Sequence, residues 1–145
     1  MSLMDPTSKM SKSHPQERSR ILITDPPDVI VERIKGAKTD SIEGVSYNHT
    51  LRPGVSNLLD ILAVFDAERR TSAELATHYS SASCKDLKVL VTESVTRGLA
   101  GFRDNYLQLL ASDDGYLEFV EAEGTRKARE SAGATMQLVR DALGL

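Results

Sequence analysis

The sequence contains no tryptophan, three scattered histidines and a single cysteine, Cys84. One thiol cannot form an internal disulfide, and the histidines lack the ligand spacing of a metal site. This cysteine usage is typical of a reducing compartment. Apolar residues never run on for the roughly 18 positions that a membrane helix needs. We therefore expect no disulfide, no protein-bound metal and no membrane span.

The chain also lacks an excess of basic charge, because 18 Lys and Arg face 21 Asp and Glu, for a net charge of −3. A general nucleic-acid binder is normally basic overall, so the net charge argues against that class. Local basic patches make phosphate contacts whatever the net charge, so a nucleic-acid partner is not excluded. The 145 residues, 40% of them apolar, suffice for one domain with a hydrophobic core.

The first residues carry no targeting signal, since they include neither an apolar signal core nor an Arg-rich amphipathic leader. We interpret Met1-Ser2-Leu3 as an introduced start, with the natural polypeptide beginning further upstream. Residues 4–20 are polar and non-periodic, which predicts a mobile arm. The β-prone run 21–24 predicts a short extended segment. Residues 25–28 predict a helix start, with Asp25 as the N-cap residue and proline in the first turn. This helix should end near residue 40. Residues 41–52 form a connector.

The remainder of the chain carries repeated helix signals. Pro53 opens one helix, and Thr71 with Glu74 forms a capping box for a short helix to about residue 79. A long amphipathic helix is expected over 85–110. Asp113-Asp114-Gly115 ends it, and a final helix follows.

We expect the final helix to be interrupted or bent near Gly124. The residues predicted to share one helix face are Val55, Leu58, Leu59, Leu62 and Phe65; Leu87, Val91, Gly98, Phe102 and Leu109; and Ala128, Ala132, Thr135, Val139 and Leu143. The pattern predicts an all-α fold, in which a helical bundle follows a loose N-terminal arm.

Two lysines flank small hydroxyl residues in that arm: Lys9, Met10, Ser11, Lys12 and Ser13. On a flexible loop, their ammonium groups, hydroxyls and backbone N–H groups make a cationic clamp for phosphate oxygens. Such a loop can close over a triphosphate and stabilise charge as the α–β phosphate bond breaks. A solvated polar tail has the same composition, so these five residues alone leave both interpretations open.

The five residues 9–13, called the KMSKS segment below, match the signature of class I aminoacyl-tRNA synthetases. The similarity continues over residues 21–25 and 37–41, a pattern that tyrosyl and tryptophanyl enzymes share. Residues 52–59 (Arg-Pro-Gly-Val-Ser-Asn-Leu-Leu) resemble the tryptophanyl branch. Residues 123–129 and 142–145 resemble that branch too. The resemblance therefore spans nearly the whole chain from Lys9.

The resemblance implies activation of tryptophan by ATP, bound as its Mg²⁺ complex, and transfer to tRNA-Trp. Lys9 and Lys12 would be catalytic, contacting the ATP phosphates and the pyrophosphate leaving group, and residues 9–13 would bind ATP. The Rossmann-type catalytic domain and the tryptophan pocket would lie upstream of Met1, so we expect this part alone to be inactive. The whole protein would be a homodimer and this part a monomer, in bacterial cytoplasm or the mitochondrial matrix rather than secreted.

His14 departs from the family pattern, in which an acidic residue more commonly follows the signature. A neutral or cationic imidazole there does not weaken anion binding, but an exposed histidine without a role is the simpler interpretation. Lys at position 12, where some enzymes have Ala, resembles bacterial and organellar members more than the eukaryotic cytosolic type.

The final helix carries a candidate tRNA-binding face. Its basic residues are Arg126, Lys127, Arg129 and Arg140, with Gln137 beside them. This clustering suits an RNA backbone or anticodon loop. The family's C-terminal helical domain serves the anticodon, so we interpret residues 53–145 as a tRNA-binding domain, after the arm (1–20) and a segment of helix and connector (21–52). A solvated face, with Glu130 and Asp141 as partners, is the alternative.

Two other interpretations remain open. One is a tyrosyl-type synthetase. The other is a free-standing helical module that binds RNA or a protein, in which the Lys-rich arm is only a tail. The upstream sequence separates the free-standing module from a synthetase, because only a synthetase carries a nucleotide-binding half before the KMSKS segment. The same upstream sequence, or the amino acid that the intact enzyme activates, separates the tyrosyl from the tryptophanyl type.

Overall fold

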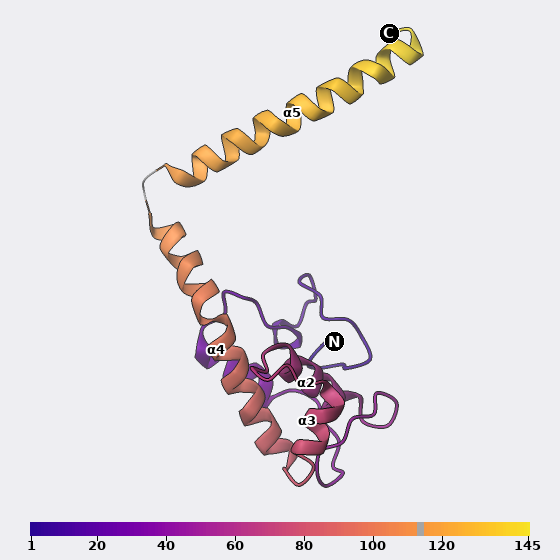
Figure 1. Ribbon diagram of the computed structural model, residues 1–145, viewed down its shortest axis with the longest axis vertical. Coiled ribbons are helices and arrows are strands. Elements are labelled where there is room, and N and C mark those ends of the chain that lie inside the picture. The colour runs from indigo at the N-terminus through magenta and orange to yellow at the C-terminus, as the bar shows by residue number, and fades with distance from the viewer. Residues whose placement is uncertain (113–114) are drawn as a thin grey trace. The chain divides into compact units, whose positions relative to one another are not determined.

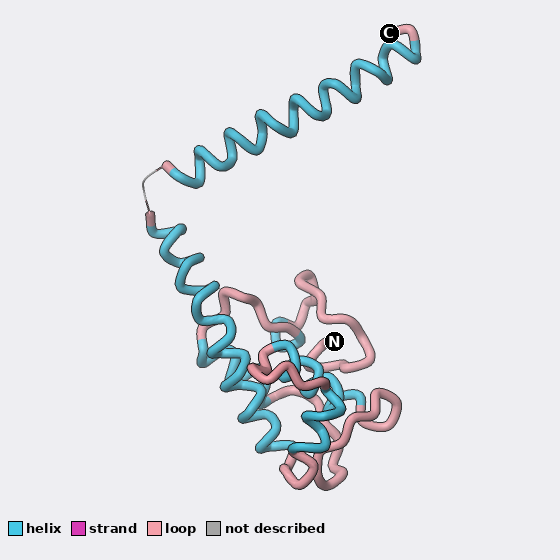
Figure 2. Tube along the Cα trace, in the orientation of Figure 1, coloured by secondary structure: helices cyan, strands magenta, loops and turns pink. Residues whose placement is uncertain are grey.

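The computed structural model describes residues 1–112 and 115–145 (Figure 1). Within these residues all regular structure is helical and no strand is present (Figure 2), which confirms the all-α prediction. The helices are a 3₁₀ turn η1 (Glu17–Ser19) and α1 (Pro27–Lys35), α2 (Pro53–Val64), α3 (Ser72–His78), α4 (Cys84–Ala111) and α5 (Tyr116–Leu143). The chain divides into two compact units, Met1–Asp104 and Asn105–Leu145.

Helices α1, α2 and α3 and the N-terminal part of α4 form the hydrophobic core of the first unit (Figure 1). Apolar residues at helical spacing fill it: Ile30, Ile34, Val55, Leu58, Leu59, Leu62, Leu75, Leu87, Val91 and Val95. Burying each such side chain stabilises the folded unit by about 1.5–3 kcal/mol. This core is the platform on which the N-terminal segment lies.

α1 differs from its prediction at both ends. Asp25 was expected to cap the helix, but Pro26 is the N-cap residue and no side chain caps it. The Asp25 carboxylate instead forms a buried ion pair with Arg33. The helix ends at Lys35 rather than near residue 40, because Gly36 breaks it and Ala37 turns into the core. The predicted extended segment 21–24 pairs with no strand and forms a turn.

The prediction of a loose arm over residues 1–20 is wrong at both ends of the arm, where Leu3 and Ser19 are buried. Leu3 is 1% exposed and belongs to the core. Its N–H donates to the carbonyl of Ser19 at 2.9 Å, and its carbonyl accepts from the N–H of Lys38 at 2.8 Å. The Met1 ammonium donates to Oδ1 of Asn57 at 2.9 Å. An apolar side chain and satisfied backbone groups therefore fix the start of the chain on α2 and on the segment after α1.

α2 and α3 begin as predicted. Pro53 stands in the first turn of α2. Gly54 follows it because a Cβ there would lie 2.1 Å from the carbonyl oxygen of Lys38, so only glycine lets the two backbones cross. Thr71 and Glu74 form the predicted capping box, in which each side chain accepts from the other residue's backbone N–H.

α4 is one residue longer at each end than the predicted 85–110. Leu87 and Val91 are buried as predicted, whereas Phe102 is 69% exposed. Between them, Gly98 lies against the ring of Phe65, and a Cβ at position 98 would lie 2.2 Å from Cδ1 of that ring. α2 ends beside the contact between Phe65 and Gly98. The core that α1, α2 and α3 form with α4 therefore does not extend along α4 to Phe102.

α5 is one continuous helix, so the predicted interruption near Gly124 is wrong. One glycine in a helix interior costs only about 1 kcal/mol relative to alanine, which is too little to break so long a helix. The predicted break at 113–115 falls partly on Asp113 and Asp114, which lie outside the described residues. Gly115 has φ = +73° and precedes the first turn of α5. No helix in the described part of the chain is long and apolar enough to cross a membrane.

Candidate functional site

The KMSKS segment lies between the packed first residues and η1. Its side chains at Lys9, Lys12 and Ser13 are exposed, and Ser11 is half-buried. Met10 is the apolar member, and its half-buried side chain packs against the hydrophobic core. The segment therefore has one apolar anchor on the first unit and presents its cationic groups to solvent.

A hydrogen-bonded turn shapes the second half of the segment. The N–H of His14 donates to the carbonyl of Ser11 at 3.3 Å, which makes Lys12 and Ser13 the central residues of the turn. The hydroxyls of Ser11 and Ser13 lie 3.2 Å apart and hydrogen-bond to each other. Lys12 is thus at the tip of a closed turn, with two hydroxyls beside it.

The residues before the segment form a second turn around Asp5. Its carboxylate accepts from the hydroxyls of Thr7 and Ser8, each at 2.6 Å. These bonds, that from Ser8 first, lower the pKa of Asp5 to about 2. The N–H of Ser2 donates to the carbonyl of Ser8 at 2.8 Å, so the residue before Lys9 is held near the fixed start of the chain.

The residues after the segment are held by Arg20. Its Nη1 donates to the carbonyl of His14 at 2.7 Å. The N–H of Gln16 donates to Nδ1 of His14 at 3.1 Å, so the imidazole has a local partner within its own segment. The carbonyl of Arg20 in turn accepts from Nη1 of Arg33 on α1 at 3.1 Å. Sequence reasoning missed this link, because Arg20, His14 and Arg33 share no recognisable spacing.

The two cations that resemblance predicts to be catalytic are uncompensated. No ion pair among the described residues involves Lys9 or Lys12. Two ammonium groups near one turn, with hydroxyl and backbone donors beside them, are chemically suited to bind an oligophosphate. No group of three or more His, Cys, Asp and Glu side chains suited to a metal ion occurs in the described residues.

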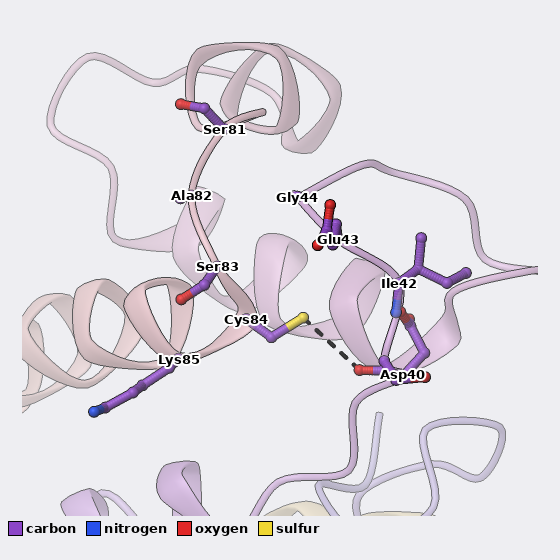
Figure 3. Close-up of a pocket in the computed structure, with 10 residues that line it drawn as sticks. Asp40, Ile42, Glu43, Gly44, Ser81, Ala82, Ser83, Cys84 and Lys85 are labelled. Carbon is purple, nitrogen blue, oxygen red and sulfur yellow. Dashed lines mark hydrogen bonds between the residues drawn. The ribbon is translucent and has the colours of Figure 1, made fainter.

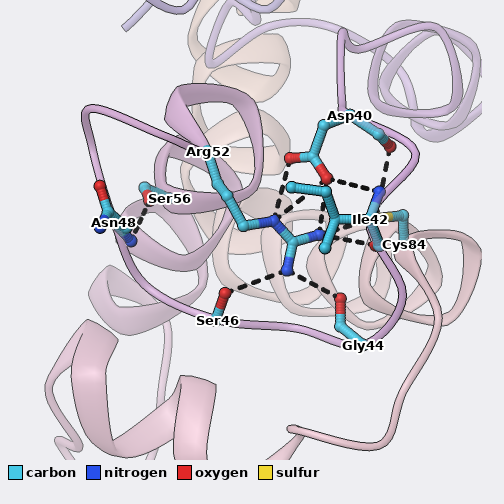
Figure 4. Close-up of polar contacts among 8 residues, drawn as sticks. All are labelled: Asp40, Ile42, Gly44, Ser46, Asn48, Arg52, Ser56 and Cys84. Carbon is cyan, nitrogen blue, oxygen red and sulfur yellow. Dashed lines mark hydrogen bonds and ion pairs between the residues drawn. The ribbon is translucent and has the colours of Figure 1, made fainter.

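A second polar cluster surrounds Arg52 (Figure 4). Its guanidinium donates to both carboxylate oxygens of Asp40, to the carbonyls of Ile42 and Gly44, and to Oγ of Ser46. The side-chain hydrogen bond from Arg52 lowers the pKa of Asp40. These acceptors lie in the segment between α1 and α2, so the cluster ties that segment to the start of α2.

Cys84 lies beside this cluster, at the mouth of an open pocket of about 750 Å³ (Figure 3). Its thiol is 3.8 Å from Nη2 of Arg52 and 3.9 Å from the carbonyl oxygen of Asp40. Cys84 itself is half-buried. These contacts place the thiol in the structural cluster rather than near the KMSKS segment.

The candidate tRNA-binding residues of α5 differ in their ion pairs. Arg126 pairs with Glu123 at 2.6 Å and with Glu130 at 2.7 Å, and Lys127 lies 3.5 Å from Glu123. Among the described residues, Arg129 and Arg140 form no ion pair. The solvated-face interpretation therefore describes Arg126, whereas two arginines of this face carry uncompensated charge.

Comparison with known proteins places these features in a family. The family model for tRNA synthetases class I (W and Y) matches residues 1–100. The chain is 38% identical over 144 residues to a tryptophan–tRNA ligase of Nostoc sp., which covers 99% of this chain and 42% of that protein. It is 33% identical over 144 residues to the chloroplastic/mitochondrial tryptophan–tRNA ligase of Arabidopsis thaliana, covering 99% of this chain and 35% of that protein.

A solved structure, the tryptophanyl-tRNA synthetase from Mycoplasma pneumoniae, resembles the whole chain with a TM-score of 0.79 and 31% identity, and 43% of its own chain is covered. The chain thus spans 42% of the length of the Nostoc relative. The family match includes the KMSKS segment and the helices that hold it. On these grounds the chain belongs to the class I tRNA synthetases, in the group of the tryptophan (W) and tyrosine (Y) enzymes.

Proposed function

We propose that this chain is part of a tryptophan–tRNA ligase and supplies its ATP-phosphate loop and helices that face the tRNA. The turn from Ser11 to His14 carries the proposal, because it presents an exposed Lys12 that forms no ion pair with any residue in the described part of the chain. The relatives that match along nearly the whole chain are tryptophan–tRNA ligases, which supports tryptophan as the amino acid.

The chemistry follows from the charge of the loop. In the first step the tryptophan carboxylate attacks the α-phosphorus of ATP, and the bond from that phosphorus to the bridging oxygen breaks. Negative charge grows on the departing pyrophosphate, where the ammonium groups of Lys9 and Lys12 neutralise it, together with the Mg²⁺ that accompanies ATP. The hydroxyls of Ser11 and Ser13 add neutral donors. In the second step a terminal ribose hydroxyl of tRNA attacks the adenylate carbonyl and releases AMP.

Closure of the KMSKS segment over the triphosphate couples recognition to rate. Its anchors lie at either side, at Met10 and at the carbonyl of His14, so closure requires movement of only a few residues. Preordered donors at the developing charge stabilise the transition state more than the ground state. Lys12, at the tip of the turn, is the stronger candidate for this role.

The test is tryptophan-dependent pyrophosphate exchange by the full-length enzyme. We expect Lys12→Ala to lower kcat/KM for ATP by about 10²–10³-fold and Lys9→Ala to lower it less, by analogy with removal of one oxyanion donor. Lys85→Ala, which removes an exposed lysine distant from the segment in sequence, is the matched control and should act as wild type. Normal exchange by a Lys9→Ala/Lys12→Ala double variant would refute the function.

The same assay separates the tryptophanyl from the tyrosyl alternative, because a tyrosyl-type enzyme exchanges pyrophosphate only with tyrosine. We further propose that the whole enzyme is a homodimer acting on tRNA-Trp, in bacterial cytoplasm or in an organelle. A bacterial relative and an organellar relative both match the chain, which supports these two compartments. Light scattering of the full-length protein tests the dimer, and a monomer that charges tRNA at the full rate would exclude it.

A further inference from the structure

Arg20 is the residue that links the KMSKS turn to the folded core. Its Nη1 reaches the carbonyl of His14 at 2.7 Å, and His14 is also the residue whose N–H closes the turn on Ser11. His14 thus closes the turn with its N–H and accepts a hydrogen bond from Arg20 with its carbonyl. The position of the turn that carries Lys12 follows from where Arg20 holds His14.

Arg20 is itself held on both sides. Its carbonyl accepts from Nη1 of Arg33, whose guanidinium is nearly buried in an ion pair with Asp25. The preceding residue, Ser19, is fully buried, and its carbonyl accepts from the N–H of Leu3. Arg33 of α1, held by its ion pair with Asp25, and the burial of Ser19 therefore fix the backbone of Arg20, so its side chain projects from a rigid base.

The bonding of Arg20 is unlike that of a residue retained for stability. Its Nε is buried and has no hydrogen-bond partner among residues 1–112 and 115–145, which is unfavourable for folding. Its Nη1 donates a hydrogen bond to the carbonyl of the exposed His14, and water can replace this donor if the arginine is removed. Loss of this side chain should therefore change the stability of the fold little while freeing the turn.

We propose that Arg20 is a positioning residue for the KMSKS turn: from the C-terminal end of η1 its side chain holds the carbonyl of His14 and so preorders the turn that presents Lys12 to the phosphates of ATP. The proposal rests on the proposed function, because it assigns a second residue to the same step. Arg20 touches neither ATP nor the reacting atoms, and it acts through Lys12. Without it, the ordering of the turn must be achieved during closure, which slows the step in which pyrophosphate departs.

The variants for the test are Arg20→Ala and Arg20→Lys in the full-length enzyme, with Arg18→Ala as the matched control. Arg18 is two residues away, carries the same charge and pairs with Glu32 on α1 instead of the turn. In pyrophosphate exchange, we expect Arg20→Ala to lower kcat about tenfold with ATP saturating and to leave KM for tryptophan unchanged. Arg20→Lys should recover most of the loss, because one ammonium donor suffices for one carbonyl. Arg18→Ala should match wild type.

A double-mutant cycle distinguishes positioning from a general structural role. If Arg20 acts through Lys12, Arg20→Ala should lower kcat little further in a Lys12→Ala background, whereas independent effects multiply. The midpoint of thermal unfolding should shift by less than about 2 °C. A multiplicative loss, or a large fall in that midpoint with no rescue by lysine, would overturn the proposal.

Trypsin cleavage provides a readout that does not depend on activity. Cleavage of the Lys12–Ser13 bond in the ATP-free enzyme should be faster in Arg20→Ala than in wild type or Arg18→Ala, since a released turn fits a protease more readily. An unchanged cleavage rate in Arg20→Ala would contradict the proposal that Arg20 orders the turn. If Lys12→Ala itself exchanges pyrophosphate normally, the proposed function fails; if it is impaired while Arg20→Ala behaves as wild type, only the positioning role fails.

Discussion

Arg52 donates to both carboxylate oxygens of Asp40, with N···O distances of 2.8 to 3.1 Å. Arg52 is 3% exposed, and further donors reach the carbonyls of Ile42 and Gly44 at 2.9 and 3.0 Å. Figure 4 shows the guanidinium at the centre of these acceptors. The residue before α2 therefore fixes the path of the connector that leads from α1 to α2.

Removing one partner of this pair should destabilise the first unit strongly. Asp40→Ala leaves the Arg52 guanidinium buried without its carboxylate, and we expect the free energy of unfolding to fall by about 3–5 kcal/mol. Glu43→Ala, in the same connector but outside the cluster, should change it by less than about 0.5 kcal/mol. Urea unfolding at neutral pH measures both. Equal values for the two variants would show that the pair contributes nothing.

Stability in acid should depend on Asp66. The side-chain hydrogen bond from Arg70 is the main cause that lowers the pKa of Asp66 from 3.8 to about 2. Because the folded pKa lies below the unfolded one, the ionised carboxylate stabilises the fold above about pH 4, and this contribution is lost as pH falls toward 2. Arg70→Met should therefore be less stable than wild type at pH 5 but similar at pH 2. Thermal unfolding midpoints from pH 2 to 6 test this, and parallel curves would contradict it.

Two helical glycines should respond oppositely to alanine. At Gly54 a Cβ would meet the backbone oxygen of Lys38 at 2.1 Å, so Gly54→Ala must displace backbone and should destabilise by about 1–3 kcal/mol. At Gly101 an added Cβ would meet no described atom within 4 Å beyond its chain neighbours and its own helix backbone, so Gly101→Ala should stabilise by up to about 1 kcal/mol. Denaturant midpoints decide, and a neutral Gly54→Ala would show that the crossing tolerates a methyl group.

The arginines of α5 should contribute unequally to tRNA binding. Arg129→Ala and Arg140→Ala each remove a charge that no ion pair in the described part of the chain compensates. Each should weaken tRNA binding by the full-length enzyme and reduce the salt dependence by about one phosphate contact. Arg126→Ala should have a smaller effect, because Glu123 and Glu130 already neutralise that guanidinium. Filter binding across salt concentrations measures this. If all three variants bind as wild type, α5 does not contact the RNA backbone through these residues.

Local signals predicted most of the helices. Pro53, the Thr71 capping box and the apolar spacing of Leu87 and Val91 depend on neighbours within one or two turns, and the structure confirms each. The predictions for Asp25 and Gly124 are wrong. Asp25 has a stronger partner in Arg33 than the helix end offers, and the penalty of one glycine is small beside a helix of good formers.

The sequence by itself determined the helical class and most of the core-facing residues of α2 and of the first half of α4, because helical periodicity and residue type are local properties. Only the tertiary structure decided where α1 ends, that Leu3 is buried, and that Arg20 grips His14 while Arg52 grips Asp40. Those outcomes depend on groups brought together from separate segments. Their hydrogen bonds and ion pairs form only once the hydrophobic core has set the distances between helices.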